Sequence, residues 1–279
     1  MATLSVEQAI PLLRARVQEQ RLIPFIGAGF SVPLGLPSWA QLVEWMAQRL
    51  GFDPKLFRVH GDSAQLAEYF DLNAEGNLAA LVEYMRQSFH RDDAEARRRA
   101  SITHTALVKI PLKTIYTTNY DEHIERAFSD ANLRCMPIAT IADFQKSYHA
   151  GTCQVLKFHG TLEEPSSIVI SESHYFNRMA LETPMDQRLR ADILGNTMLF
   201  IGYRFSDMNI RNIWYRMHQL RKQSGAQAAA RRSYVTVLGS LGLVQERLLS
   251  EWGIDIIELS RDRNLVNRQM QQLLTEIAR

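Results

Sequence analysis

Short apolar segments alternate with amphipathic segments along most of the chain, and this alternation predicts a parallel β-sheet covered by helices. Buried strands are expected where apolar residues follow one another and stop at a glycine or a polar residue. The predicted strands are residues 22–26, 113–117, 154–158, 197–202, 233–238 and 254–259. The expected fold class is therefore α/β, a Rossmann-like parallel sheet with helices on both faces.

A helical lobe is predicted between the first two strands. Ser38 and Gln41 have the spacing of a capping box that opens a helix, and a helix at 102–110 is expected to stop at Pro111. Between them, one helix face is formed by Leu78, Leu81, Val82, Met85 and Phe89. One domain with an inserted lobe fits the length of 279 residues. We predict a core at about 20–37 and 111–260, a lobe at about 38–110, and a C-terminal helix at about 262–278.

The later strands are expected to be separated by further helices. Apolar residues at helical spacing predict helices around 124–128 and 210–220, and a third between the last two strands. The segment 223–231 is small and polar and is expected to be a surface loop. The C-terminal helix has an apolar face, which we expect to pack on its own domain.

Composition and charge exclude several classes of protein. The 32 basic and 30 acidic residues leave a net charge of +2, which gives no reason to expect direct nucleic-acid binding. Local basic clusters at 97–99, 221–222 and 231–232 are interpreted as solvated faces. No apolar run is long enough to span a membrane, and the N-terminus lacks the apolar core of a signal peptide.

Cysteine usage points to a reducing compartment. Only Cys135 and Cys153 are present, so a disulfide framework is not expected and a cytoplasmic location is. Two cysteines also cannot form a four-cysteine zinc site, and no metal is expected.

The first chemically suggestive segment is a glycine loop after the first strand, Gly27-Ala28-Gly29-Phe30-Ser31. Glycine permits close approach of a phosphate to the backbone, the start of a following helix offers N–H donors, and Ser31 adds a hydroxyl. The alternative is an ordinary tight turn, because Val32 stands where a dinucleotide fingerprint has its third glycine.

Two further strands end in polar residues. Asn119 follows the strand at 113–117, and ligands of open parallel sheets bind beyond such strand ends. Asp121 is either part of the same site or a helix cap. His159-Gly160 follows the strand at 154–158, where the imidazole could act as a general base or simply bond to the backbone of a loop. His104, His123 and His174 lack this context and are interpreted as structural.

The fourth segment follows the strand at 197–202. Gly202 ends that strand, and Ser206 or Asp207 could contact a ligand or cap the next helix. Arg204 could pair with a phosphate or face solvent. The four segments fall in order at one edge of the predicted sheet.

In combination these residues resemble the sirtuin superfamily over about residues 22–260. The glycine loop is similar to its GAG-x-S phosphate loop, and Gly35-Leu36-Pro37 to the glycine–hydrophobe–proline that follows. Thr118-Asn119-Tyr120-Asp121 resembles its T-x-N-x-D segment, and His159-Gly160 its catalytic His-Gly pair. The two zinc-binding CxxC pairs of sirtuin deacetylases are missing, so no zinc module is expected. In this respect the chain resembles the prokaryotic sirtuin-like group found in antiphage defence.

The resemblance implies an enzyme that uses NAD⁺ as its substrate and cleaves it to nicotinamide and ADP-ribose. Asn119 and His159 would be the catalytic residues. The pyrophosphate would lie on Gly27, Ala28, Gly29, Phe30 and Ser31, with Asp121 near the nicotinamide side. Gly202, Ser206 and Asp207 would lie toward the adenosine end.

Other interpretations stay open. The pocket could serve deacylation or ADP-ribosyl transfer, although the missing zinc module argues against deacylation, or it could only bind nucleotide. The resemblance also implies a gated activity, a homo-oligomer, or a partner such as a HerA-like DNA-translocating ATPase or an Argonaute-like protein.

Overall fold

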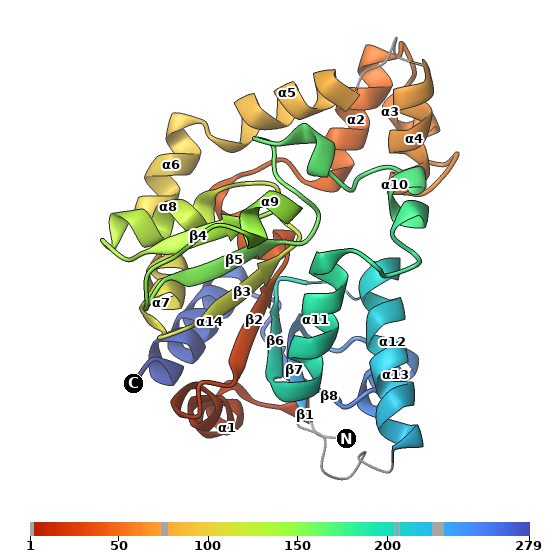
Figure 1. The fold of residues 1–279 in the computed structure, drawn as a ribbon. Helices are drawn as coiled ribbons and strands as arrows, with labels where there is room; N and C mark the ends of the chain where they lie inside the picture. The colour runs from red at the N-terminus through yellow and green to blue at the C-terminus, as the bar shows by residue number, and fades with distance from the viewer. Residues whose placement is uncertain (1–2, 74–77, 204, 206, 225–231) are drawn as a thin grey trace.

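The computed structural model describes residues 3–73, 78–203, 205, 207–224 and 232–279, without the side chain of Arg263. Within these residues, eight parallel strands form one sheet in the order β1-β8-β7-β6-β2-β3-β5-β4 (Figure 1). The strands are β1 Thr3–Leu4, β2 Leu22–Ile26, β3 Thr114–Thr117, β4 Cys135–Ile138, β5 Cys153–Lys157, β6 Thr197–Ile201, β7 Ser233–Leu238 and β8 Ile254–Leu259. All six predicted strands are present, and the α/β class is confirmed.

Alternation along the strands directs side chains to two opposite faces of the sheet. In β2, Leu22 and Ile26 belong to one core cluster, whereas Ile23 and Phe25 belong to the other. The first face is covered by α1 Val6–Gln18, α7 Ile102–Lys109, α8 His123–Asp130 and α14 Arg263–Ile277. The second is covered by α11 Pro184–Gly195, α12 Met208–Gln223 and α13 Leu243–Glu251, with Phe144 of α9 Ile141–Phe144 packed against it. Helices therefore lie on both faces, as predicted.

A third cluster of buried residues forms a helical layer at one end of the sheet (Figure 1). Its helices are α2 Trp39–Arg49, α3 Pro54–Phe57, α4 Ser63–Asn73 and α5 Leu78–Phe89. The expected capping box opens α2, since the Ser38 hydroxyl accepts from Gln41 and the Gln41 side chain accepts from the Ser38 N–H. The loop after β5 joins the same cluster through Leu162, Ile168 and Ile170, and leads to α10 Glu172–Asn177 beside α4.

The helical segment at 38–110 is not packed as one body. After α5, α6 Asp92–Arg99 returns the chain toward the sheet, and α7 packs in the core cluster with α14 and α8. Ala106, Leu107 and Val108 of α7 are buried there. α7 therefore supports the sheet, although we expected it to belong to the lobe.

Three short 3₁₀ turns complete the described elements: η1 Ala28–Phe30, η2 Val32–Leu34 and η3 Pro165–Ser167. None of the helices within the described ranges combines the length and apolar character needed to cross a bilayer. The two cysteines face each other in register on β4 and β5, and both are free thiols.

Candidate active site

The four predicted segments meet at the carboxyl edge of the sheet, because they follow the neighbouring strands β6, β2, β3 and β5. The chain runs from β2 to β3 and β5 on one side, and then to β6 on the other side of β2. Such a reversal of strand order opens the crevice in which open α/β sheets bind ligands. Thr117 of β3 pairs with Lys157 of β5, which brings Asn119 and His159 to the same level beyond their strands.

The glycine loop packs directly on the turn after β6. The N–H groups of Gly27 and Gly29 donate to the carbonyls of Ile201 and Gly202, both at 2.9 Å. A Cβ at Gly27 would lie 2.5 Å from the Gly202 oxygen. Gly202 itself has a φ of +62°, and a Cβ there would lie 2.3 Å from the Phe30 nitrogen. Only glycine permits this close approach of two loops.

Most N–H groups of this loop are already used. Phe30 donates to the Gly27 carbonyl and Ser31 to the Ala28 carbonyl, both at 3.0 Å. Within the described part of the chain, the Ala28 N–H is the one in this loop that donates to no main-chain carbonyl. Ala28 is also exposed, so it is the donor of the loop that a phosphate can reach.

The side chains of Phe30 and Ser31 have different surroundings. The Phe30 ring is buried against His104 of α7, with ring centroids 4.4 Å apart, so it serves the core. The Ser31 hydroxyl is buried and accepts a hydrogen bond from Nδ2 of Asn119 at 3.2 Å. Ser31 therefore belongs to the site, and Phe30 can contribute only through its main chain.

Asn119 is held by the glycine loop on one side of its amide. Its Nδ2 donates to the Gly27 carbonyl at 3.3 Å as well as to Ser31, and its main-chain N–H donates to the Thr117 hydroxyl at 3.0 Å. Its Oδ1 is buried and has no partner within the described residues. A buried acceptor without a donor is costly, and a substrate hydroxyl or a water would satisfy it.

His159 contacts an acidic side chain from the far end of the site. Its Nε2 lies 2.8 Å from Oδ2 of Asp207, a contact of ion-pair length that lacks the alignment of a hydrogen bond. Both side chains are buried, and the Tyr175 ring lies edge-on to the imidazole at 5.5 Å. Gly160 follows at a φ of +82°, where a Cβ would collide with the Ser167 carbonyl. The imidazole is thus confined beside a carboxylate.

Asp207 both caps a helix and contacts His159. Its Oδ1 accepts from the N–H groups of Asn209 and Ile210 and so caps α12, while Oδ2 faces His159. Burial opposes ionisation of Asp207, but His159 and the two N–H donors outweigh it and hold the pKa of the carboxyl below its ordinary value. We expected Asp207 at the adenosine end of the ligand, and the structure instead pairs it with His159. Ser206 and Arg204 lie outside the described residues.

Asp121 has no contact with Asn119 or His159 among the described residues. Its carboxylate accepts from the His123 N–H at 3.1 Å, at the start of α8, and its carbonyl accepts from the buried Lys157 ammonium at 2.5 Å. These contacts hold Asp121 next to the start of α8, although the N-cap residue of that helix is Glu122 and makes no side-chain cap bond. Sequence reasoning therefore placed Asn119, His159 and the glycine loop together, but it did not connect Asp207 with His159. An Asp that caps a helix carries no signal of a second contact with a residue 48 positions away.

The fold and this edge define an α/β domain with a candidate ligand site at the switch point of a parallel sheet. The family model described as "SIR2-like domain" matches residues 113–257. The chain belongs to that family, which confirms the resemblance inferred from its motifs.

Curated relatives extend the similarity over most of the chain. The "NAD(+) hydrolase ThsA" of Bacillus cereus (strain MSX-D12) is 29% identical over 234 residues, which are 83% of this chain and 46% of that protein. A protein of the same name from Acinetobacter baumannii (strain 532279) is 27% identical over 72% of this chain and 40% of its own length. The "Defense-associated sirtuin 2" of Bacillus subtilis is 22% identical over 79% of this chain and 21% of its own length. The chain thus spans less than half the length of these relatives.

Proposed function

We propose that this chain hydrolyses NAD⁺ to nicotinamide and ADP-ribose. The observation that carries the proposal is the meeting of the glycine loop, Asn119 and His159 at one switch point of the sheet. The NAD(+) hydrolases to which the chain is similar support the choice of substrate. The same site could serve deacylation, ADP-ribosyl transfer or nucleotide binding without turnover, and the absence of a four-cysteine zinc module argues against deacylation.

The glycine loop would hold the pyrophosphate. The exposed Ala28 N–H is a donor for a phosphate oxygen, and the absence of side chains at Gly27 and Gly29 allows the ligand to approach the backbone. The Ser31 hydroxyl and the Asn119 amide form one buried unit behind this loop. In this arrangement the nicotinamide ribose lies toward Asn119 and His159, and the adenosine lies toward Gly202.

The reaction needs little acid catalysis, because the leaving group is a pyridinium that departs as neutral nicotinamide. As its bond to ribose C1′ breaks, positive charge develops on the ribose, and a water attacks C1′ and loses a proton. The buried Oδ1 of Asn119 would accept a hydrogen bond from that water or from a ribose hydroxyl. His159 would take up the proton, and the adjacent Asp207 carboxylate would stabilise the resulting imidazolium.

Chromatography of NAD⁺, nicotinamide and ADP-ribose tests this function directly. We expect turnover by the wild type and a loss of at least about 100-fold in both Asn119→Ala and His159→Ala. His149→Ala is the control, because His149 is exposed and precedes the amino end of β5, whereas the site lies at the carboxyl ends of the strands. Acetyl-peptide turnover faster than peptide-independent NAD⁺ loss would favour the deacylase instead. Bound NAD⁺ without turnover, even with a partner present, would favour a binding module.

We also infer that the activity is gated and serves antiphage defence in the cytoplasm, since free NADase activity would deplete the NAD⁺ of its own cell. The relative named as a defence-associated sirtuin supports the defence role. Gating would require self-association or a partner such as a HerA-like ATPase or an Argonaute-like protein. Specific activity that rises with protein concentration, in step with an oligomer seen by light scattering, would support self-association. If specific activity does not change with protein concentration and the protein stays monomeric, gating by a partner is favoured.

A further inference from the structure

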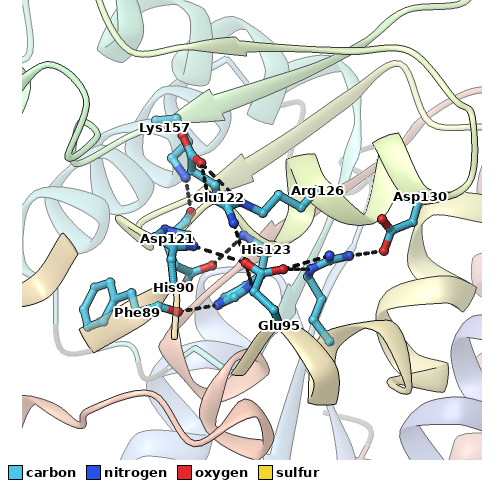
Figure 2. A network of polar contacts seen from close by, with 10 residues as sticks. Phe89, His90, Glu95, Asp121, Glu122, His123, Arg126, Asp130 and Lys157 are labelled. Carbon is cyan, nitrogen blue, oxygen red and sulfur yellow. Dashed lines mark hydrogen bonds and ion pairs between the residues drawn. The ribbon is translucent and has the colours of Figure 1, made fainter. Parts of the chain in front are cut away.

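Two histidines and a glutamate converge between α6 and the start of α8 (Figure 2). His90 follows α5, Glu95 lies on α6, and His123 is the first residue of α8. Oε1 of Glu95 lies 3.6 Å from Nδ1 of His90 and 4.0 Å from Nδ1 of His123. One ligand atom from each residue falls within 4.8 Å of the other two. The three atoms therefore enclose a space the size of one ion.

The orientation of His123 aims its Nδ1 at this space. Its Nε2 lies 2.9 Å from the Phe89 carbonyl, which only accepts hydrogen bonds, so Nε2 carries a proton. Nδ1 is buried without a partner among the described residues. Metal-binding histidines are commonly fixed in this way, by donating the other ring N–H to a carbonyl.

The Nδ1 atom of His90 is buried and likewise lacks a hydrogen-bond partner within the described residues, although Glu95 lies opposite it. The two imidazole Nδ1 atoms thus face Oε1 of Glu95, which also accepts a hydrogen bond from Arg126. A cation would satisfy both unpartnered nitrogens and would be shared with this carboxylate oxygen.

The charge of the surrounding network suits a divalent cation. Arg98 and Arg126 are its guanidinium groups, and four carboxylates accompany them (Figure 2). The carboxylates are Glu95, Glu122, Asp130 and Asp121. Lys157 and Glu125 neutralise each other at 3.2 Å. The network therefore has two negative charges more than positive ones.

We propose that His90, Glu95 and His123 bind a divalent transition-metal ion, with Zn²⁺ as the ion that best fits two imidazoles and one carboxylate. Zinc–ligand bonds of about 2.0–2.2 Å in a tetrahedral site place the ligand atoms roughly 3.3–3.5 Å apart, so the site needs only a small contraction. A water would occupy the fourth position. Arg126, whose side chain is 39% exposed, would release Oε1 of Glu95 and keep its ion pair with Glu122.

The site would join the connection between α5 and α6 to the loop that carries Asn119. His123 lies four residues after Asn119, and its main-chain N–H is bound by Asp121 in that loop. The ion would therefore support the active-site edge from behind without touching substrate. This inference concerns metal binding alone, so the metal titration tests it independently of whether the chain hydrolyses NAD⁺. It departs from the absence of metal expected from the sequence, which considered only cysteine ligands.

Cobalt and zinc titration of the untagged, chelator-treated protein tests the proposal. We expect one equivalent of Co²⁺ to produce the visible absorption of a four-coordinate ion, and Zn²⁺ to displace it and raise the melting temperature. His90→Gln removes one ligand and keeps a polar side chain of similar length at a position whose side chain is 14% exposed. This variant should bind Co²⁺ at least about 100-fold more weakly. His149→Gln, at an exposed histidine outside the network, should bind as the wild type does.

The proposal is overturned if the wild type shows no stoichiometric binding at micromolar metal, or if His90→Gln retains the cobalt spectrum and affinity. An octahedral spectrum that survives in His90→Gln would place the ion on surface carboxylates and would also overturn it. His123→Gln provides a second variant, and circular dichroism establishes whether it folds. If His123→Gln does not fold, the cobalt spectra of the wild type and of His90→Gln are sufficient to test the metal site.

Discussion

The Asp207 side chain caps a helix with one oxygen and contacts the proposed base with the other. Asp207→Asn separates these tasks, because Asn caps helices as well as Asp does. We expect the free energy of unfolding to fall by less than about 2 kcal/mol, whereas kcat/KM for NAD⁺ falls at least about 10-fold because the imidazolium loses its counter-charge. Urea unfolding and chromatographic assay of the same preparation provide both values.

Asp262→Asn is the matched control for Asp207→Asn. Asp262 caps α14 with the same geometry, through the N–H groups of Asn264 and Leu265, and it is exposed. It follows β8, which β7 separates from the four strands that carry the site. Its replacement should leave turnover of NAD⁺ unchanged. Full activity in Asp207→Asn would show that the carboxylate acts only as a cap, and His159 would then work without an acidic neighbour.

Gly202 offers a prediction about backbone geometry. Gly202→Ala adds a Cβ at a φ of +62° and places it within 2.7 Å of main-chain atoms of Gly29 and Phe30. Gly51→Ala adds the same atom at a φ of +75° with nothing within 4 Å. We expect Gly51→Ala to cost about 1 kcal/mol from the left-handed backbone alone, and Gly202→Ala to cost more than about 3 kcal/mol. Equal losses of stability in Gly202→Ala and Gly51→Ala would mean that the glycine loop moves away from the added Cβ without a cost in free energy.

Much of the site could be predicted at this scale, because strand ends and glycines are visible in the sequence. Asn119 and His159 each follow an apolar run, and the register of β3 and β5 brings them together. Other features depend on three-dimensional contacts that no local pattern encodes. Only the packing of Gly29 on Gly202 shows that the N–H of Ala28 is the one left for a ligand. The convergence of His90 and His123 depends equally on the path of α5 and α6.

Among the elements, α14 packs on its own domain. Leu273, Leu274 and Ile277 are fully buried, and the helix contacts α1 and α7. Leu274→Ala should lower the free energy of unfolding by about 2–5 kcal/mol, because a cavity replaces a packed side chain. Leu265→Ala on the same helix, at a residue that is 46% exposed, should change it by less than about 1 kcal/mol. Chemical denaturation compares the two, and similar losses would contradict this packing.

Elements with clear periodicity were predicted and irregular ones were not. The strands at 233–238 and 254–259 have the predicted bounds, since long apolar runs mark both ends. β4 was missed because its four residues include Pro137, which is tolerated there because β4 lies at the edge of the sheet. α1 was also missed, and it contains Pro11 within its length. Its capping box of Ser5 and Gln8 is the signal that could have identified it.

At the scale of the whole molecule, three hydrophobic clusters explain how the site is held. Two lie on opposite faces of the sheet, and the third joins the helical layer to the loop that follows His159. Leu162, Ile168 and Ile170 of that loop pack with α2 to α5, so the position of the imidazole depends on the helical layer. The order of strands follows from long-range pairing, and the sequence could predict the strands but not that order.

Buried histidines predict how the stability of the whole molecule depends on pH. Burial lowers the pKa of His104 to about 4, from an ordinary value near 6.5. Between these values the unfolded chain binds a proton that the folded chain does not, so stability falls as the pH decreases through this interval. One such group accounts for roughly 3 kcal/mol between neutral pH and pH 4. His90, whose pKa is also lowered, adds to the same trend.

His104→Asn isolates the contribution of His104 to this pH dependence. The amide can keep the hydrogen bond that Nδ1 makes with the Ser101 hydroxyl at 2.8 Å, but it cannot take up a proton. We expect urea unfolding in the presence of chelator to show a shallower loss of stability between about pH 6.5 and pH 4. His149→Asn, at an exposed histidine, should follow the wild-type curve. A wild-type slope in His104→Asn would mean that His104 is protonated in the folded state, and that the acid sensitivity arises elsewhere, as at His90.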